Sequence, residues 1–173
     1  QVLVEKNGRG YGEGEIVRYA LQHSAYIAKA QCFAKCSSKL WVENFAACAQ
    51  AWRGDLLLQG VFLNVFQPWK PLVFSYIDTR FYIANVELYK KFFENAHLLI
   101  NKKEKFGLEN AFHKIVLDRE IHSALTPVPP VIGGMGGTIA TYYDTSFRRR
   151  IKDALRLKMV TRTEQYKKLF IAL

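Results

Sequence analysis

Apolar residues recur at spacings of three and four along most of the chain, which is the pattern of amphipathic helices. One such stripe starts after Glu15, a second ends at Gly54, and a third follows Thr79. A further helix is expected over residues 109–125. Several of these segments are apolar around much of their circumference, as helices buried on more than one side are. The pattern therefore predicts an all-α domain of five to seven helices around one core.

Two segments interrupt this pattern, and both are rich in glycine or proline. Residues 1–14 contain four glycines, which predicts an extended N-terminal arm. Residues 126–141 contain three prolines followed by four glycines, so we expect an irregular strap there. The helical core is then expected over residues 15–125. Residues 142–173 are expected to form a basic C-terminal helical hairpin.

The most apolar stretch, residues 55–77, consists of two runs separated by Pro68, Trp69, Lys70 and Pro71. Together the runs reach membrane-spanning length, but a span needs about 20 apolar residues without a break. We therefore expect a buried helix, a proline turn and a short extended piece. The alternative is a segment that lies against a membrane interface, where aromatic and basic residues are common. Its candidate interface residues are Phe66, Trp69, Lys70 and Phe74.

The formal net charge is +10, and most of it comes from the C-terminal end. Nine basic residues lie between Arg148 and Lys168, opposed by Asp153 and Glu164 alone. Arginine binds phosphate through two parallel hydrogen bonds, so lipid phosphates, RNA or an acidic subunit would suit this end. The candidate residues for binding an anionic partner are Arg148, Arg149, Arg150, Lys152 and Arg156, with Tyr142 and Tyr143 placed to stack on bases. The apolar stripe of the same helix is Phe147, Ile151, Leu155 and Met159.

The residues show no pattern typical of catalysis or of a cofactor site. The glycine-rich segment 133–137 lacks the Gly-Lys-Ser/Thr ending of a phosphate-binding Walker loop. Cys32 and Cys36 could share a helix face, but no histidine lies at ligand spacing nearby. Asp118 and His122 are four residues apart, yet a metalloprotease site needs a second histidine. We therefore expect a protein that is not an enzyme and has no metal, no cofactor and no small-molecule substrate.

A basic end, an arm and a strap without site chemistry indicate a structural subunit. We expect a non-catalytic accessory subunit of a large organellar complex, such as a mitochondrial respiratory or ATP-synthase assembly beside the inner membrane. The start at Gln1 instead of Met fits a processed form, for example one without its transit peptide. Its partners would be other protein subunits through protein–protein contacts, with anionic lipid as a further candidate. The alternative is an RNA-binding protein such as an organellar ribosomal subunit. We identify no family from these residues.

Overall fold

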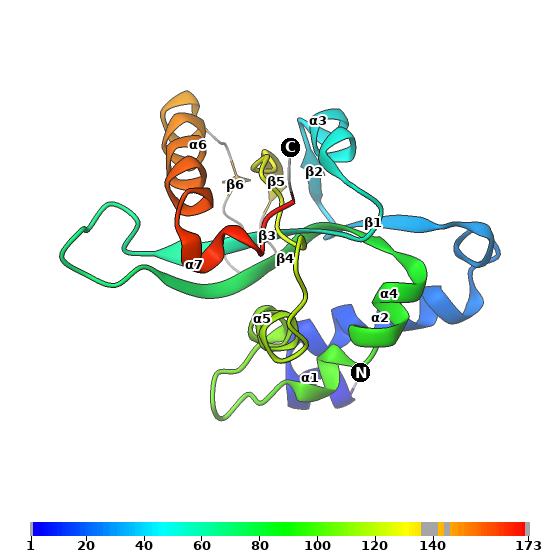
Figure 1. Ribbon diagram of the computed structural model, residues 1–173. Coiled ribbons are helices and arrows are strands. Elements are labelled where there is room, and N and C mark those ends of the chain that lie inside the picture. The colour runs from blue at the N-terminus through cyan, green and yellow to red at the C-terminus, as the bar shows by residue number, and fades with distance from the viewer. Residues whose placement is uncertain (1, 136–141, 144–145, 172–173) are drawn as a thin grey trace.

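The structure is a computed structural model, and it describes residues 2–135, 142–143 and 146–171. Two antiparallel sheets form its centre, with helices above and below them (Figure 1). With 44% helical and 23% strand residues, the fold is mixed α/β, so the predicted all-α fold of five to seven helices is wrong. The error lies mainly between residues 32 and 85, where apolar segments expected as helices form strands.

The first sheet is built on a long β-hairpin. Its strands, in spatial order, are β1 (Cys32–Cys36), β4 (Val73–Asn85) and β3 (Leu56–Leu63). Leu56, Leu57 and Leu58 at the start of β3 are all buried, because both faces of the sheet are covered there. A strand buried on both faces reads as a continuous apolar run without alternation. For this reason the sequence could not distinguish β3 from the buried helix that we expected.

Two short segments extend the sheet beyond β3. Leu125 pairs in parallel with Leu58 on one side and with Phe170 on the other. The Thr126 N–H donates to the Leu58 carbonyl at 2.8 Å, and the Ile171 N–H donates to the Leu125 carbonyl at 3.0 Å. The C-terminal residues are thus joined by backbone hydrogen bonds to the central sheet.

The second sheet contains part of the glycine-rich strap. Its strands, in spatial order, are β2 (Leu40–Val42), β5 (Ile132–Met135) and β6 (Tyr142–Tyr143). A Cβ at Gly133 would lie 2.6 Å from the Trp41 indole nitrogen, so glycine allows this ring to pack on the strand backbone. Within the predicted strap, Ile132–Met135 is therefore a strand of a sheet, and residues 126–131 are in neither a helix nor a strand. Residues 136–141 of the strap lie outside the described residues. Helix α3 (Phe45–Ala51) lies beside β2 (Figure 1).

Below the first sheet in Figure 1 lies a layer of helices that includes the N-terminus. These are α1 (Val2–Asn7), α2 (Arg9–His23), α4 (Val86–Phe92), the 3-10 helix η2 (Ala96–Leu99) and α5 (Leu108–Asp118), and a second 3-10 helix, η1 (Ile27–Lys29), follows α2. Gly10 and Gly14 are four residues apart and share one face of α2. A Cβ at Gly14 would lie 2.3 Å from the His97 Cβ, and one at Gly10 would lie 3.1 Å from the Leu108 Cβ. The predicted extended arm over residues 1–14 is therefore wrong, because these glycines allow close helix packing.

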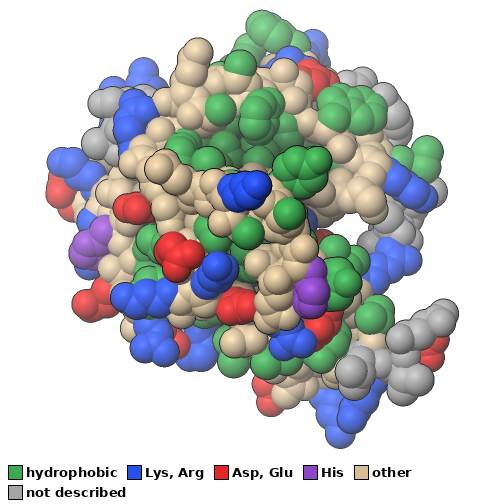
Figure 2. All heavy atoms as spheres, turned by 90° about the vertical axis from the view of Figure 1, so that its right-hand side faces the viewer, with side chains coloured by type: hydrophobic (Ala, Val, Ile, Leu, Met, Phe, Trp, Pro, Cys, Tyr) green, Lys and Arg blue, Asp and Glu red, His purple; other side chains and the backbone are tan. Residues whose placement is uncertain are grey.

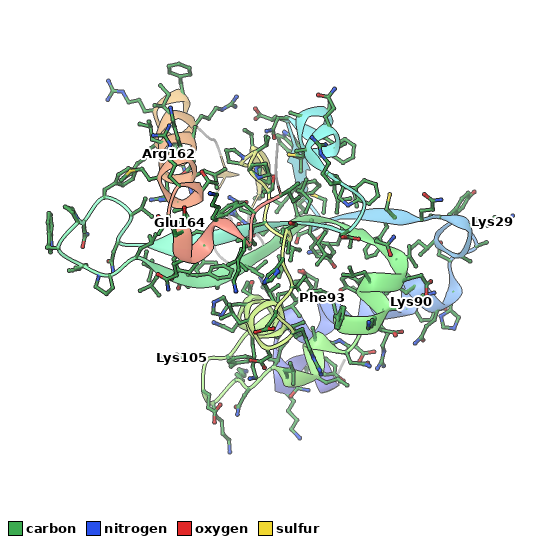
Figure 3. The ribbon with its side chains drawn as sticks, in the orientation of Figure 1. Lys29, Lys90, Phe93, Lys105, Arg162 and Glu164 are labelled. Atoms are coloured by element: carbon green, nitrogen blue, oxygen red, sulfur yellow. The ribbon has the colours of Figure 1, made fainter. Side chains whose placement is uncertain are left out.

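An aromatic cluster fills the space between this layer and the sheet. Phe93, which lies between α4 and α5 in Figure 3, has its ring centre 4.7 Å from that of Phe112. Phe112 also contacts Tyr82 of β4, at 5.6 Å between ring centres. The Tyr82 and Tyr89 hydroxyls are 3.1 Å apart, and burial raises the pKa of Tyr89 to about 12. The cluster therefore stays uncharged at physiological pH.

His113 on α5 makes stability depend on pH. Its ring stands edge-on to Phe74 at 4.4 Å, and its Nε2 is buried without a hydrogen-bond partner in the described part of the chain. Burial lowers the pKa of His113 below its ordinary value of 6.5. The unfolded chain thus takes up this proton at a higher pH than the folded chain does. The contribution of His113 to the free energy of unfolding is therefore fully present above the unfolded pKa of about 6.5, and it is lost as the pH falls below that value.

We therefore expect wild type to lose stability as the pH is lowered from about 7 to about 5.5, and His113→Leu to lose less. Urea unfolding at the two pH values measures this difference. This pH window lies above the titration of Glu15. Burial raises the pKa of Glu15, but the His97 hydrogen bond, Arg18, the His97 charge and the Tyr11 hydrogen bond together lower it below 4.5. Equal losses in both proteins would show that His113 does not contribute.

Candidate partner-binding surface

Helix α6 (Phe147–Thr161) packs on the other side of the first sheet through one face. Val160 is fully buried, and Leu157 packs against the same core. Asp153 and Arg156 line a cavity of about 70 Å³ between the helix and the sheet. Ser146 caps the helix, because its hydroxyl accepts from the Arg149 N–H at 3.4 Å. The basic helix expected in this region is present, and it is followed by α7 (Glu164–Lys167).

The apolar stripe of α6 faces away from the body of the protein. At 100° per residue, its centre lies about opposite the packed face around Asp153 and Val160. The exposed fractions are 76% for Phe147, 45% for Ile151, 52% for Leu155 and 48% for Met159. The apolar stripe predicted from the sequence is therefore exposed and does not pack on the core.

Most of the cations on α6 have no acidic partner. Arg150 pairs with Glu43, and Arg156 pairs with Asp153 at 2.9 Å. Among the ion pairs of the described residues, none involves Arg148, Arg149, Lys152, Lys158 or Arg162, and all five side chains are exposed. Arg162 directly follows the last residue of α6, and Glu164, labelled below it in Figure 3, begins α7. Three of the five basic residues predicted to bind a partner are therefore exposed, and no carboxylate of the described residues forms an ion pair with them.

The loop between β3 and β4, residues 64–72, lies next to α6. It extends from the body at the left of Figure 1 and carries Trp69, which is 76% exposed, and the exposed Lys70. The Phe66 ring lies under two cations of α6, with its centre 5.9 Å from the Lys152 Nζ and 5.8 Å from the Arg156 Cζ. These cation–π contacts join the predicted basic site and the predicted membrane-interface site into one surface. We call the surface formed by the exposed side of α6 and by residues 64–72 the α6–loop surface.

Three predicted site residues do not contribute to this surface as described. Phe74 is buried in the core, with its ring centre 4.9 Å from that of Phe62, so it is not available to a partner. Tyr142 and Tyr143 form β6, and their side chains fall outside the described part of the structure. The sequence analysis had missed Leu63, which is half exposed at the end of β3. No sequence signal marks it, since it belongs to the apolar run of β3.

A groove of about 1360 Å³ lies beside the end of β1 and the middle of β4, between α2 and the loop before α5. Part of its polar lining is held by ion pairs and hydrogen bonds between α2, the sheet and η2. Lys35 pairs with Glu13 and donates to the Ser37 hydroxyl at 2.9 Å, and the buried His97 Nε2 lies 2.8 Å from Glu15. These pairs tie α2 to the sheet, whereas Lys39, Lys102 and Lys105, which also line the groove, are in no ion pair of the described residues.

Side chains suited to metal binding do not gather in the described part of the chain: it holds no group of three or more His, Cys, Asp or Glu residues that could bind an ion. Burial raises the pKa of the Cys48 thiol to about 11 and also raises that of Cys36. A reactive thiol needs the opposite shift, because the thiolate is the nucleophile.

No protein-family model, no curated protein and no solved structure matches this chain. Within the described ranges, no helix has both the length and the apolar character needed to cross a membrane. The interpretation of function therefore depends on the surfaces described above.

Proposed function

We propose that the chain is a non-catalytic accessory subunit of a membrane-associated protein assembly. The main support is that large apolar side chains are exposed at separate places on the molecule. The α6–loop surface lies at the left of Figure 1. At the other end, Ile16, Tyr19 and Tyr26 on α2 and before η1 are 72%, 65% and 90% exposed. Extended exposed apolar surface usually marks a contact with another molecule.

A third exposed apolar group lies near α3. Trp41 on β2 and Phe45 on α3 are each about half exposed. On the face that Figure 2 presents, hydrophobic side chains gather in the upper half, and most of the charged ones lie below. Contacts at several places are typical of a subunit with several neighbours, and less so of a protein with one ligand. The mitochondrial inner membrane as the location of the assembly stays a prediction.

The alternative function, RNA binding, is favoured by the four cations of α6 that are in no ion pair of the described residues, Arg148, Arg149, Lys152 and Lys158. Phosphate contacts would account for Arg148, Arg149 and Lys152, and RNA affinity would then fall linearly with the logarithm of salt concentration. Phosphate contacts with RNA would not cover Ile151 and Leu155, however, and these apolar side chains would stay exposed. The accessory-subunit proposal accounts for both kinds of side chain, and we prefer it for that reason.

Migration of the native protein tests this proposal. A tagged chain expressed in its own cells is extracted from membranes with a mild detergent and separated on a native gel. We expect it to migrate in an assembly several times larger than its own 19.9 kDa and to be enriched in the membrane fraction. Recovery as a free monomer without membrane enrichment would contradict the proposal.

Tyr26 provides a variant for the same experiment. Since Tyr26 is 90% exposed, Tyr26→Ser should leave the melting temperature unchanged. If the ring is buried by a neighbouring subunit, its loss should weaken association by about 30-fold, as for an aromatic interface residue. Lys90→Ser on the exposed side of α4 is the matched control and should migrate as wild type (Figure 3). If Tyr26→Ser migrates as Lys90→Ser and wild type do, Tyr26 does not lie in a subunit interface.

A further inference from the structure

We infer that the α6–loop surface is the part of the protein that contacts the membrane, and that it binds a layer of anionic lipid headgroups. This inference rests on the membrane association in the proposed function and names the ligand of one surface. It starts from the orientation of α6. Because Leu157 and Val160 fix the opposite face on the sheet, Phe147, Ile151 and Leu155 remain presented to the outside.

The dimensions of α6 suit a helix that lies in the membrane interface. Its 15 residues span about 22 Å, shorter than the hydrocarbon core of a bilayer. Interfacial helices insert an apolar face between the headgroups and keep basic side chains at the phosphate level. The stripe from Phe147 to Met159 can fill the first role. Exposed Arg148 and Lys152, which lie beside the stripe, can fill the second by extending their charged ends toward the phosphates.

The β3–β4 loop adds a second contact at the same surface. Tryptophan is enriched at the membrane–water interface, where its ring sits at headgroup level. Trp69 is 76% exposed, and the neighbouring Lys70 is exposed as well. The contacts of Lys152 and Arg156 with the Phe66 ring hold this loop beside α6. The helix and the loop tip can therefore touch one flat surface together.

Charge complementarity decides which lipid is bound. The exposed cations Arg148, Arg149, Lys152, Lys158 and Lys70 are not paired with any carboxylate among the described residues. Asp153 and Glu43, two acids in contact with side chains of α6, are already paired with Arg156 and Arg150. A layer with negative phosphates attracts such a surface, whereas a neutral layer gains the apolar contacts alone.

Vesicle binding of the purified full chain tests the inference. We expect cosedimentation with vesicles of phosphatidylcholine containing about 30% phosphatidylserine, and little with phosphatidylcholine alone. The tryptophan emission should shift to the blue on binding, and the shift should be lost in Trp69→Phe. Absence of binding to the anionic vesicles, or equal binding to the neutral ones, would overturn the inference.

Two variants separate charge from apolar contact. Arg148→Gln/Lys152→Gln/Lys158→Gln should weaken anionic-vesicle binding on the order of a hundredfold, since each cation near the surface contributes about fivefold. Ile151→Gln/Leu155→Gln should weaken it about tenfold or more through lost insertion. All five positions are exposed, so melting temperatures should match wild type.

A control with the same change in charge is available on the opposite side of the first sheet. Lys102, Lys103 and Lys105 are exposed in the loop before α5, which lies below the first sheet in Figure 3, whereas α6 lies above it. Their triple replacement by Gln should leave vesicle binding within about threefold of wild type, because these charges would not face the lipid. A loss as large as that of the α6 variant would show that net charge alone drives binding, and would overturn the inference.

The competing partner is an outcome of the same experiment. If the Ile151→Gln/Leu155→Gln variant binds vesicles as wild type does, and the chain instead binds RNA with a steep salt dependence, the surface is an RNA site and the inference is wrong. If vesicles are not bound while the chain still migrates in a large membrane assembly, the inference fails and the proposed function stands. If vesicles are bound but no assembly is found, the proposed function fails instead.

Discussion

Gly14→Ala is expected to lower the free energy of unfolding by about 2–3 kcal/mol, although alanine is the better helix former by about 1 kcal/mol. The added Cβ would lie 2.3 Å from the His97 Cβ and 2.5 Å from its Cγ. His97 is buried, and its Nε2 is held 2.8 Å from Glu15, so the ring cannot turn away without breaking this contact. Helix α2 must then separate from η2. Urea unfolding followed by circular dichroism measures the loss.

Gly12→Ala is the matched control on the same helix. Its Cβ would meet the Val4 Cγ2 at 3.1 Å, and Val4 is partly exposed and free to turn. This variant should keep wild-type stability or gain up to about 1 kcal/mol from helix propensity. If Gly14→Ala were as stable as Gly12→Ala, the close packing of α2 against η2 at Gly14 would be wrong.

The glycines of the first 14 residues show why composition alone misled the prediction. Four glycines in one segment are typical of a loose chain, but Gly10 and Gly14 are spaced so that they share one helix face. That spacing is equally typical of a helix that closely approaches a neighbour. The two interpretations differ in what lies opposite the glycine face, here His97 and Leu108, and no local pattern in the sequence contains that information.

The central hairpin could not be predicted for a different reason. The start of β3 is buried on both faces, so its leucines lack the alternation that marks a half-exposed strand. The prolines at 68 and 71 correctly indicated a break in the chain, and the structure places the loop there. The structure has a strand on each side of this break, where we expected a helix and an extended piece. Two strands form because residues such as Val61 and Tyr76 pair with each other, and this pairing cannot be read from either segment alone.

Most residues of the α6–loop surface could be predicted from the sequence, but their arrangement in space could not. Basic residues after Ser146 and aromatic residues around Trp69 were both recognised as partner-binding candidates. Nothing in either pattern indicates that Phe66 lies against Lys152, more than 80 residues away. The orientation of α6 was also hidden. Periodicity identifies an apolar face, yet the face that packs here includes Asp153 and the one that is exposed carries Phe147.

Phe170→Ala is the second change for which we expect a large effect, a loss of about 3–5 kcal/mol in the free energy of unfolding. Phe170 is buried, its ring lies 6.0 Å from that of Phe62, and its backbone pairs in parallel with Leu125. Removing the ring leaves a cavity at the point where the C-terminal segment joins the sheet. Amide hydrogen exchange should then rise first in α6 and α7, which are attached through this segment.

Phe147→Ala is the control, because it removes the same side chain from a position that is 76% exposed. It should change the free energy of unfolding by no more than about 0.5 kcal/mol. Phe170→Ala tests whether α6 is anchored to the sheet through the C-terminal segment. Phe147→Ala tests whether the outer face of α6 is exposed. If Phe147→Ala cost as much as Phe170→Ala, the outer face of α6 would be packed within the chain. The α6–loop surface would then not be free to bind a membrane.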